Sequence, residues 1–371
     1  MKAIILAAGQ GTRLRPLTYD MPKPMIPVLG RPVMDYLVRH LASHGVTDIM
    51  VNVSHLGYRI EQYFGDGSRH GVNIGYSFEG HLENGEVVPA PVGSAGALRK
   101  IQDFGGFIDD TLVVVCGDAI IDLDVSAALA EHRARGALAS VIAKEVPWEA
   151  VPSYGVIEAD ASGRIVSFQE KPRREDARSN WASTGIYILE PEAVALVPPG
   201  RPFDIGSELF PMLAERGLPF FVQRHDFNWI DIGQASDYLK VVMELLAKPV
   251  AGAAIPGAEV RPGVWCGLNV KVNWEKVDVR GPVYIGAGTQ IEDGARILGP
   301  AWIGHGSRVE RDATVSRVVT FEYSRVSARA HLEDAIISGR YCVDREGRSL
   351  FRDEGHRNWA WGDARLLGAA A

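Results

Sequence analysis

Short apolar runs alternate with helical patterns along residues 1–245 of the chain. An apolar stripe with helical spacing predicts helices over Met34–His44, Val125–Arg135 and Gln234–Ala247. Strands that alternate with helices favour a largely parallel sheet with helices on its faces. The runs that predict strands are Ala3–Ala7, Asp48–Val53, Asn73–Phe78, Thr111–Val115, Ala139–Ala143 and Gly185–Leu189.

Beyond Pro249 the pattern changes to a repeat of six residues, with glycines between the aliphatic positions. A six-residue period predicts one aliphatic side chain on each flat face of a triangular coil, and several coils must stack to bury these side chains. The alternative is a β-sandwich with accidental spacing. The aliphatic positions are Val279, Ile285, Ile291, Ile297, Ile303, Val309 and Val315, and Val326 and Leu332 resume the spacing after a slip of one residue.

The two patterns predict a domain at residues 1–245, a coil domain at 246–343 and a tail at 344–371 that caps the coil or contacts another subunit. The apolar fraction of 46% is ample for packed cores, and the net charge of −7 argues against a surface that coats nucleic acid. Three widely spaced cysteines fit a reducing cytoplasm. No apolar stretch approaches the ~18 residues that cross a bilayer, so we expect a soluble, cytoplasmic protein.

The first predicted strand runs into a loop, GQGTRLRP, that combines glycines with basic residues. Gly9 and Gly11 would let backbone N–H groups approach a phosphate closely. Arg13 and Arg15 follow, and Lys23 lies between two prolines that restrict its backbone. The loop lacks the last glycine of GxGxxG and does not match GxxxxGK[ST]. The pattern favours a triphosphate site, and the alternative is solvated charge around a turn.

Two carboxylates occupy positions that suggest a metal site. Asp118 follows the apolar run LVVVC, which places it at the carboxyl end of a strand, where ligands collect in open α/β sheets. Asp231 lies in the apolar segment WIDIG, where an unpaired charge would be costly. Mg²⁺ favours a couple of carboxylates with phosphate oxygens and water. Asp118 could instead cap a turn or helix, and we expect Asp122 and Asp124 to cap the helix over 125–135.

Five motifs in this order resemble those of sugar-1-phosphate nucleotidyltransferases, such as glucose-1-phosphate thymidylyltransferases and mannose-1-phosphate guanylyltransferases. They are GQGTRLRPLT with PKPM, GSAGAL at 93–98, VCGDA at 115–119, FQEKP at 168–172 and WIDIG at 229–233. The resemblance covers residue 1 to about 245. It implies a Rossmann-like, GT-A-like α/β domain with a mixed, mostly parallel sheet. The six-residue repeat is similar to the C-terminal left-handed parallel β-helix of many members.

The resemblance also implies a role for individual residues. The nucleotide would contact Ala8, Gly9, Gly11, Thr12, Arg13, Glu79, Gly93, Ala95 and Gly96. The sugar phosphate would contact Glu170, Lys171, Thr184 and Gly185. Asp118 and Asp231 would hold Mg²⁺, and Arg13, Lys23 and Asp118 would be catalytic. Many members have Asn-Ala where this chain has Ser183-Thr184, so we expect the Thr184 hydroxyl to replace the asparagine.

The expected reaction is in-line attack by a sugar 1-phosphate oxygen on the α-phosphorus of an NTP, without a general base. GSAGALRK, GDAIIDLD and WIDIG look closest to mannose-1-phosphate guanylyltransferases, which favours GTP and mannose 1-phosphate or a related sugar. Glucose 1-phosphate with dTTP or UTP is the alternative. The segment Gly80–Val92 could be a mobile lid over the nucleotide.

Two other classes of function remain open. The chain could be a catalytically silent subunit that binds an NDP-sugar and regulates a partner. The coil domain could instead transfer acyl groups with His305 or His331 as base, although both are read as surface histidines. Its expected role is subunit contact, in a homo-oligomer that is a dimer or tetramer.

Overall fold

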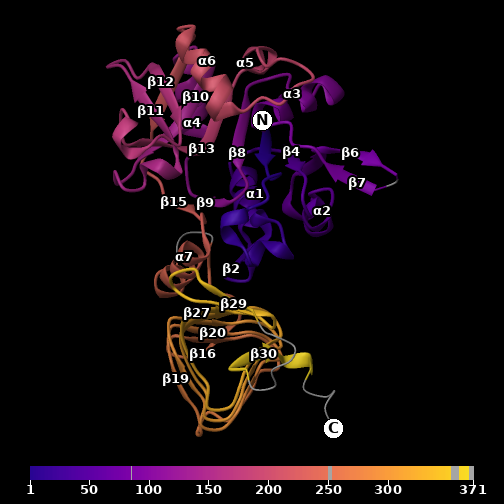
Figure 1. Cartoon of the computed structure of the whole chain (residues 1–371), viewed down its shortest axis with the longest axis vertical. Coiled ribbons are helices and arrows are strands. Elements are labelled where there is room, and N and C mark those ends of the chain that lie inside the picture. The colour runs from indigo at the N-terminus through magenta and orange to yellow at the C-terminus, as the bar shows by residue number, and fades with distance from the viewer. Residues whose placement is uncertain (85, 250–252, 352–358, 367–371) are drawn as a thin grey trace. The chain divides into compact units, whose positions relative to one another are not determined.

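The computed structural model describes residues 1–84, 86–249, 253–351 and 359–366 (Figure 1). The chain forms two compact units that interleave along the sequence. The first comprises residues 1–10, 20–25 and 33–230, and the second comprises 11–19, 26–32 and the described part of 231–371. The domain boundaries expected at residues 245 and 343 stay a prediction.

A nine-stranded mixed sheet is the frame of the first unit, in the order β12-β11-β13-β8-β1-β4-β5, with β10 beside β13 and β14 beside β10. Its strands are β1 (Lys2–Leu6), β4 (Asp48–Val53), β5 (Asn73–Phe78), β8 (Leu112–Cys116), β10 (Ala139–Glu145), β11 (Gly155–Ala159), β12 (Ile165–Glu170), β13 (Trp181–Leu189) and β14 (Phe220–Arg224). Strand β1 is parallel to β4 and β8, and β4 is parallel to β5, whereas β13 is antiparallel to β8. The carboxyl ends of β1, β4, β5 and β8 therefore share one edge (Figure 1).

Helices cover both faces of this sheet. Side chains alternate along a strand, so Ala3 and Ile5 of β1 pack in one core cluster and Ile4 packs in the other. The first cluster includes residues of α1 (Val33–Ser43), α2 (Gly57–Phe64) and α4 (Val125–Ala134). The second includes residues of α3 (Ser94–Gly105), α5 (Pro191–Ala195), α6 (Phe210–Glu215) and the π-helical turn η7 (Ile205–Leu209). Within the described residues, no helix has both the length and the apolar character to cross a membrane.

Short elements complete the chain. Two-residue to four-residue strands pair as β2 (Pro27–Val28) with β3 (Arg31–Pro32), β6 (Gly80–Glu83) with β7 (Glu86–Pro89), and β9 (Ala119–Ile121) with β15 (Trp229–Asp231). The 3₁₀ turns are η1 (Thr12–Leu14), η2 (Leu17–Tyr19), η3 (Lys23–Met25), η4 (Ser68–His70), η5 (Val151–Ser153), η6 (Arg174–Asp176) and η8 (Ala364–Leu366). The segment expected as a lid is thus an antiparallel hairpin, of which residue 85 lies outside the described residues.

All six predicted strands and three predicted helices are present. The bounds of β4 and β5 agree with the prediction, whereas β10 and β13 extend beyond their apolar runs because they pair with each other. Asp124 caps α4 as expected, since its Oδ1 accepts a hydrogen bond from the Ala127 N–H at 2.9 Å. The same expectation for Asp122 is wrong, because its carboxylate accepts from both the backbone and the side chain of Asn228.

The second unit contains a parallel β-helix with three ladders of strands, which confirms the coil predicted from the six-residue repeat. The ladders run through β17-β20-β23-β25, β18-β21-β24-β26 and β19-β22-β25-β27. Ile291 pairs with Val309, a step of 18 residues, and Val309 pairs with Val326, a step of 17, which is the predicted slip. The strands are β16 (Ala258–Arg261), β17 (Val264–Cys266), β18 (Lys271–Val272), β19 (Asp278–Arg280), β20 (Val283–Ile285), β21 (Gln290–Ile291), β22 (Arg296–Leu298), β23 (Ala301–Ile303), β24 (Arg308–Val309), β25 (Thr314–Thr320), β26 (Ser324–Val326) and β27 (His331–Ile337).

Antiparallel strands close this coil, and α7 (Ala235–Ala247) packs on it. Strands β28 (Tyr341–Val343) and β29 (Ser349–Phe351) follow β27, and β30 (Trp361–Asp363) pairs with β26. The buried Tyr238 of α7 donates from its hydroxyl to the carbonyl of Pro27 at 2.8 Å and stacks on Phe321. Of the predicted tail, residues 352–358 and 367–371 lie outside the described residues.

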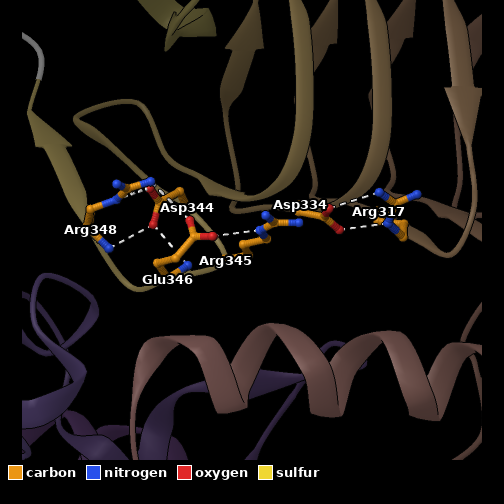
Figure 2. Close-up of polar contacts among 6 residues, drawn as sticks. All are labelled: Arg317, Asp334, Asp344, Arg345, Glu346 and Arg348. Atoms are coloured by element: carbon orange, nitrogen blue, oxygen red, sulfur yellow. Dashed lines mark hydrogen bonds and ion pairs between the residues drawn. The ribbon is translucent and has the colours of Figure 1, made fainter.

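Charged residues gather on strands β25 and β27 and in the turn between β28 and β29, and Figure 2 shows six of them. Arg317 binds Asp334 through two hydrogen bonds of 2.7 and 2.9 Å. Arg345 pairs with Glu346, and Arg348 pairs with Asp344. The Arg317 guanidinium holds the pKa of the Asp334 carboxyl below its usual value. The Arg317–Asp334 pair joins β25 to β27 in successive coils, whereas the other two pairs lie within the turn between β28 and β29.

Candidate active site

A cavity of about 600 Å³ opens at the sheet edge where the parallel strands end. All of its lining residues belong to the first unit. They are Leu6, Ala7, Ala8, Gly9, Gln10, Lys23, Pro24, Asn52, Glu79, Pro91, Gly93, Ser94, Cys116, Asp118, Lys171 and Asp204. Loops from distant parts of the sequence meet here because β1, β4, β5 and β8 point the same way. We call this space the active-site cavity.

The loop after β1 forms one side of the cavity. The Ala7 N–H donates to the Asn52 carbonyl at 2.9 Å, which extends the β1–β4 ladder by one residue before the chain turns into the loop. A Cβ built on Gly9 would meet no atom within 4 Å. The backbone at Gly9 is therefore open to the cavity, as a loop that receives a phosphate requires.

Asp118 lies just beyond the carboxyl end of β8, where its position was predicted. Its carboxylate forms an ion pair with the Lys23 ammonium, and both side chains are largely buried. A buried pair of this kind is stabilised by mutual compensation, since either charge alone would be costly. The structure thus brings together two of the three predicted catalytic residues.

Glu79 and Asn52 line the cavity at the ends of β5 and β4. The Asn52 amide donates to Glu79 Oε1 at 2.6 Å, and Glu79 Oε2 accepts from the Val92 N–H at 3.4 Å. The amide orientation is fixed by the carboxylate, because the Asn52 oxygen would be repelled from it. Glu79 therefore ties the base of the β6–β7 hairpin to the sheet.

Two loops pair along another side of the cavity, and we call residues 91–96 and 201–205 the paired loops. Ser94 donates to the Asp204 carboxylate at 2.8 Å, and its oxygen accepts from the Ile205 N–H. Burial opposes ionisation of Asp204, but hydrogen bonds from Ser207, Ser94 and Gly206 outweigh it and lower its pKa. Gly93 has φ +75°, and a Cβ there would lie 2.5 Å from the carbonyl oxygen of Phe203. The close approach of the two loops therefore requires glycine.

Lys171 reaches the cavity from the end of β12, and its ammonium lies 2.8 Å from Glu170 Oε1. Gly185, with φ +73°, is packed beside Cys116, where a Cβ would lie 2.8 Å from Sγ. The expectation for Thr184 is not supported by its placement. Its hydroxyl donates to the Ile142 carbonyl at 2.8 Å and the residue is buried, so this hydroxyl does not face the cavity.

Other predicted site residues lie elsewhere. Ala95 and Gly96 are buried in the first turn of α3 and do not line the active-site cavity. Gly11, Thr12, Arg13 and Asp231 belong to the second unit, so their part in the site stays a prediction. His305 and His331, the residues considered for acyl transfer, are exposed on the β-helix.

The charge of the cavity limits what it can hold. Its lining has two cations, Lys23 and Lys171, and three carboxylates, Glu79, Asp118 and Asp204. This set alone would repel a triphosphate. Among the described residues, no group of three or more His, Cys, Asp or Glu side chains could hold a metal. An ion that is held by few carboxylates and completed by phosphate oxygens and water does not need such a group.

Sequence reasoning missed Asn52, Cys116 and Asp204 as lining residues of the cavity. Asn52 is a polar residue near the end of the apolar run IMVNV, which is a usable signal of a strand end at a site. Asp204 begins the helical segment DIGSEL, and it caps η7 by accepting from the Gly206 and Ser207 N–H groups. That local role does not reveal that its carboxylate also faces a cavity.

A family profile described as "Nucleotidyl transferase" matches residues 2–248. The chain belongs to this family. It is 50% identical over 98% of its length, and 94% of the relative's, to a UTP–glucose-1-phosphate uridylyltransferase of Synechocystis sp.. It is 29% identical over 80% of its length, and 77% of the relative's, to a mannose-1-phosphate guanylyltransferase of Mycobacterium tuberculosis.

A solved structure supports the same assignment. It is a putative glucose-1-phosphate thymidylyltransferase from Bacillus anthracis in complex with a sucrose, with a TM-score of 0.56 and 27% identity. The match covers 69% of this chain and 98% of that one. The resemblance identified from the five motifs is confirmed, and so is the fold class.

Proposed function

We propose that this nucleotidyltransferase transfers a nucleoside monophosphate from an NTP to a sugar 1-phosphate, with Mg²⁺ as cofactor, and releases pyrophosphate. One observation carries the proposal. A single cavity at the ends of parallel strands gathers the loop Ala8–Gln10, Lys23, Asp118 and Lys171. Backbone donors, fixed cations and a carboxylate are what a reaction between two phosphate groups needs.

In this proposal the residues act by position and charge. The loop at Gly9 receives the triphosphate, Lys23 neutralises charge on the departing pyrophosphate together with Arg13, and Lys171 holds the sugar phosphate with Glu170 beside it. The phosphate nucleophile is already ionised, so no side chain needs to remove a proton. Mg²⁺, held by Asp118 and Asp231, would neutralise charge between the two phosphate groups when bound.

For the substrates we favour UTP and glucose 1-phosphate. The relative that carries this name is 50% identical and is matched along almost the whole chain. GTP and mannose 1-phosphate, the pair indicated by the motifs, are the second candidate, since relatives named for that reaction are 29–33% identical. A cytoplasmic location and a homo-oligomeric state belong to the same proposal, and the three cysteines, which form no disulfide with one another, suit a reducing compartment.

The test is a matrix of four NTPs and dTTP against glucose, mannose and galactose 1-phosphates, with purified protein and Mg²⁺, read as pyrophosphate release. We expect UTP with glucose 1-phosphate to give the highest kcat/KM, by at least about tenfold. A maximum with GTP and mannose 1-phosphate would reverse the choice of substrates only. No pyrophosphate release from any pair, with NDP-sugar binding retained, would support the silent regulatory subunit instead.

A further inference from the structure

A second cavity, of about 300 Å³, shares a wall with the active-site cavity. The paired loops form this wall. Gly93, Ser94 and Asp204 line the active-site cavity, whereas Val92 and Arg201, from the same two segments, line the second one. We call the second space the rear cavity, and all of its lining residues belong to the first unit.

Hydrogen bonds couple the two loops of the shared wall. The Phe203 N–H donates to the Val92 carbonyl at 2.9 Å, and the Gly96 N–H donates to the Phe203 carbonyl at 2.8 Å. Ser94 and Asp204 add the side-chain bond described above. A ligand that displaces Val92 would therefore act on its hydrogen bond with Phe203, whose neighbour in the chain, Asp204, lines the active-site cavity.

Positive charge predominates in the rear cavity. Arg99, Lys100 and Arg201 line it with a single carboxylate, Asp103, which already accepts from Arg99 Nε at 2.8 Å. Lys100 uses one N–H to reach the Phe78 carbonyl at 2.6 Å, and Arg201 uses Nη1 to reach Glu208 at 3.2 Å. N–H groups remain on both side chains for an anion. This excess of cations stands out in a chain of net charge −7.

The remaining lining is apolar. Phe104, at the end of α3, is 86% exposed, and Val92, Pro198 and Pro202 lie around the same space. An exposed aromatic ring beside fixed cations suits a ligand with one planar apolar part and one anionic part. Phosphate esters of aromatic molecules have this chemistry, and their size agrees with the cavity.

We propose that the rear cavity binds a small aromatic phosphate ester and that binding there changes nucleotide affinity through the paired loops. Binding itself is independent of the proposed function. The coupling rests on the proposed function, because the coupling requires that the nucleotide occupies the active-site cavity.

The binding test uses 1-naphthyl phosphate and the full-length protein, with calorimetry as readout. We expect Arg201→Gln to weaken binding about tenfold, the loss of one charge-assisted contact, and Phe104→Ser roughly threefold or more. Arg133→Gln on α4 and Tyr58→Ser on α2, an exposed cation and an exposed aromatic ring away from the cavity, should leave the dissociation constant unchanged. Inorganic phosphate and 1-naphthol, each with half of the chemistry, should bind at least about tenfold more weakly.

The coupling test measures UTP affinity with and without saturating 1-naphthyl phosphate. By linkage, the probe and UTP must change each other's affinity by the same factor. The proposal would be overturned if the probe competed strictly with UTP and its dissociation constant were the same in Arg201→Gln, Phe104→Ser and the unaltered protein. The probe would then bind in the active-site cavity. Unchanged UTP affinity would overturn the coupling. Absence of probe binding would also overturn the site, even if Phe104→Ser changed the oligomeric state. Probe binding to a protein that shows no catalysis would count only against the proposed function.

Discussion

Lys23 and Asp118 form an ion pair in the lining of the active-site cavity. Both side chains are largely buried, with exposed fractions of 14% and 26%, so each needs the other or a substitute when substrates bind. A triphosphate offers new partners to the lysine, and a divalent cation offers one to the carboxylate. In the proposed reaction each charge would exchange its partner for a substrate or a cation, so the pair compensates both charges before the substrates bind.

Asp118→Asn tests this role at the scale of a single residue. The asparagine keeps the shape and can still accept from Lys23, but it lacks the charge that would hold a divalent cation. We expect kcat to fall roughly 100- to 1,000-fold, as for other losses of electrostatic stabilisation, with the fold retained and a lower melting temperature, because the Lys23 ammonium loses its charged partner. The measurement is steady-state pyrophosphate release with the best substrate pair.

Asp109→Asn is the matched control, since Asp109 is an exposed carboxylate that also pairs with a lysine, Lys2, at 2.6 Å. It should retain the full rate. A rate for Asp118→Asn within a factor of about three of the unaltered protein would contradict the assignment of Asp118.

The position of Asp118 at the cavity was predictable because its signal lies in the neighbouring sequence, which places a carboxylate directly after a buried strand. Asn52 and Asp204 were not, because each acquires its role from a distant partner. Glu79 lies 27 residues from Asn52, and Ser94 lies 110 residues from Asp204. Thr184 shows the opposite case. Its local sequence suggested that its hydroxyl replaces an asparagine at the site, but this hydroxyl donates to the Ile142 carbonyl inside the fold.

At the scale of elements, a buried polar network joins α4, β10 and the start of α5. His132 is fully buried, with Nδ1 at 2.8 Å from the Ser140 hydroxyl and Nε2 at 3.0 Å from Glu190 Oε1. Thr111 donates to the same Glu190 oxygen at 2.9 Å. The set resembles a hydrolase triad in composition, but His132 and Ser140 are fully buried, which makes it a structural link.

The pH dependence of stability tests this network. Burial lowers the pKa of His132, although Glu190 opposes the shift. As pH falls below about 6.5, the unfolded chain binds a proton that the folded chain resists, so stability decreases toward the folded pKa. We expect His132→Gln to flatten this slope between pH 7 and 5.5 and to cost roughly 1–3 kcal/mol at pH 8.

Urea unfolding at several pH values gives both quantities. His81→Gln is the control, because His81 is an exposed histidine of the hairpin that pairs only loosely with Glu83, at 3.7 Å. It should leave the slope unchanged. An equal slope in His132→Gln and the unaltered protein would show that His132 does not titrate differently in the two states.

Elements were the most predictable level because their signals are periodic. The β-helix followed from one aliphatic residue in six, and α1, α4 and α7 followed from helical stripes. Helices α2 and α3 escaped detection because their buried stripes are short and interrupted by glycine, alanine or polar residues. Strand β11 escaped because its buried run is only Gly155, Val156 and Ile157, and β12 escaped because exposed and polar positions separate its buried residues Ile165 and Phe168.

Each of the two units has its own source of stability on the scale of the whole molecule. The first has apolar clusters on both faces of its sheet, and the second stacks coils around a narrow aliphatic interior. The last coils add the ion pairs of Figure 2, of which Arg317–Asp334 joins residues one coil apart and the other two lie within the turn between β28 and β29. These pairs could not be predicted, because any of several charged corner residues could have faced Arg317.

Asp334→Asn measures what such a pair contributes to the second unit. Arg317 lowers the pKa of Asp334, so the pair stabilises the coil above the unfolded value of about 3.9 and is lost as pH falls through the lower folded value. The side chains are 24% and 43% exposed, so solvent screening limits the cost at pH 7 to roughly 0.5–1 kcal/mol. Hydrogen–deuterium exchange over residues 314–337 should show that the free energy of opening falls by this amount at pH 7, and 1 M salt should reduce the difference.

Glu322→Gln, at an exposed corner of the same coil, should leave protection unchanged. Equal protection in Asp334→Asn and the unaltered protein at low salt would show that aliphatic stacking alone holds these coils together.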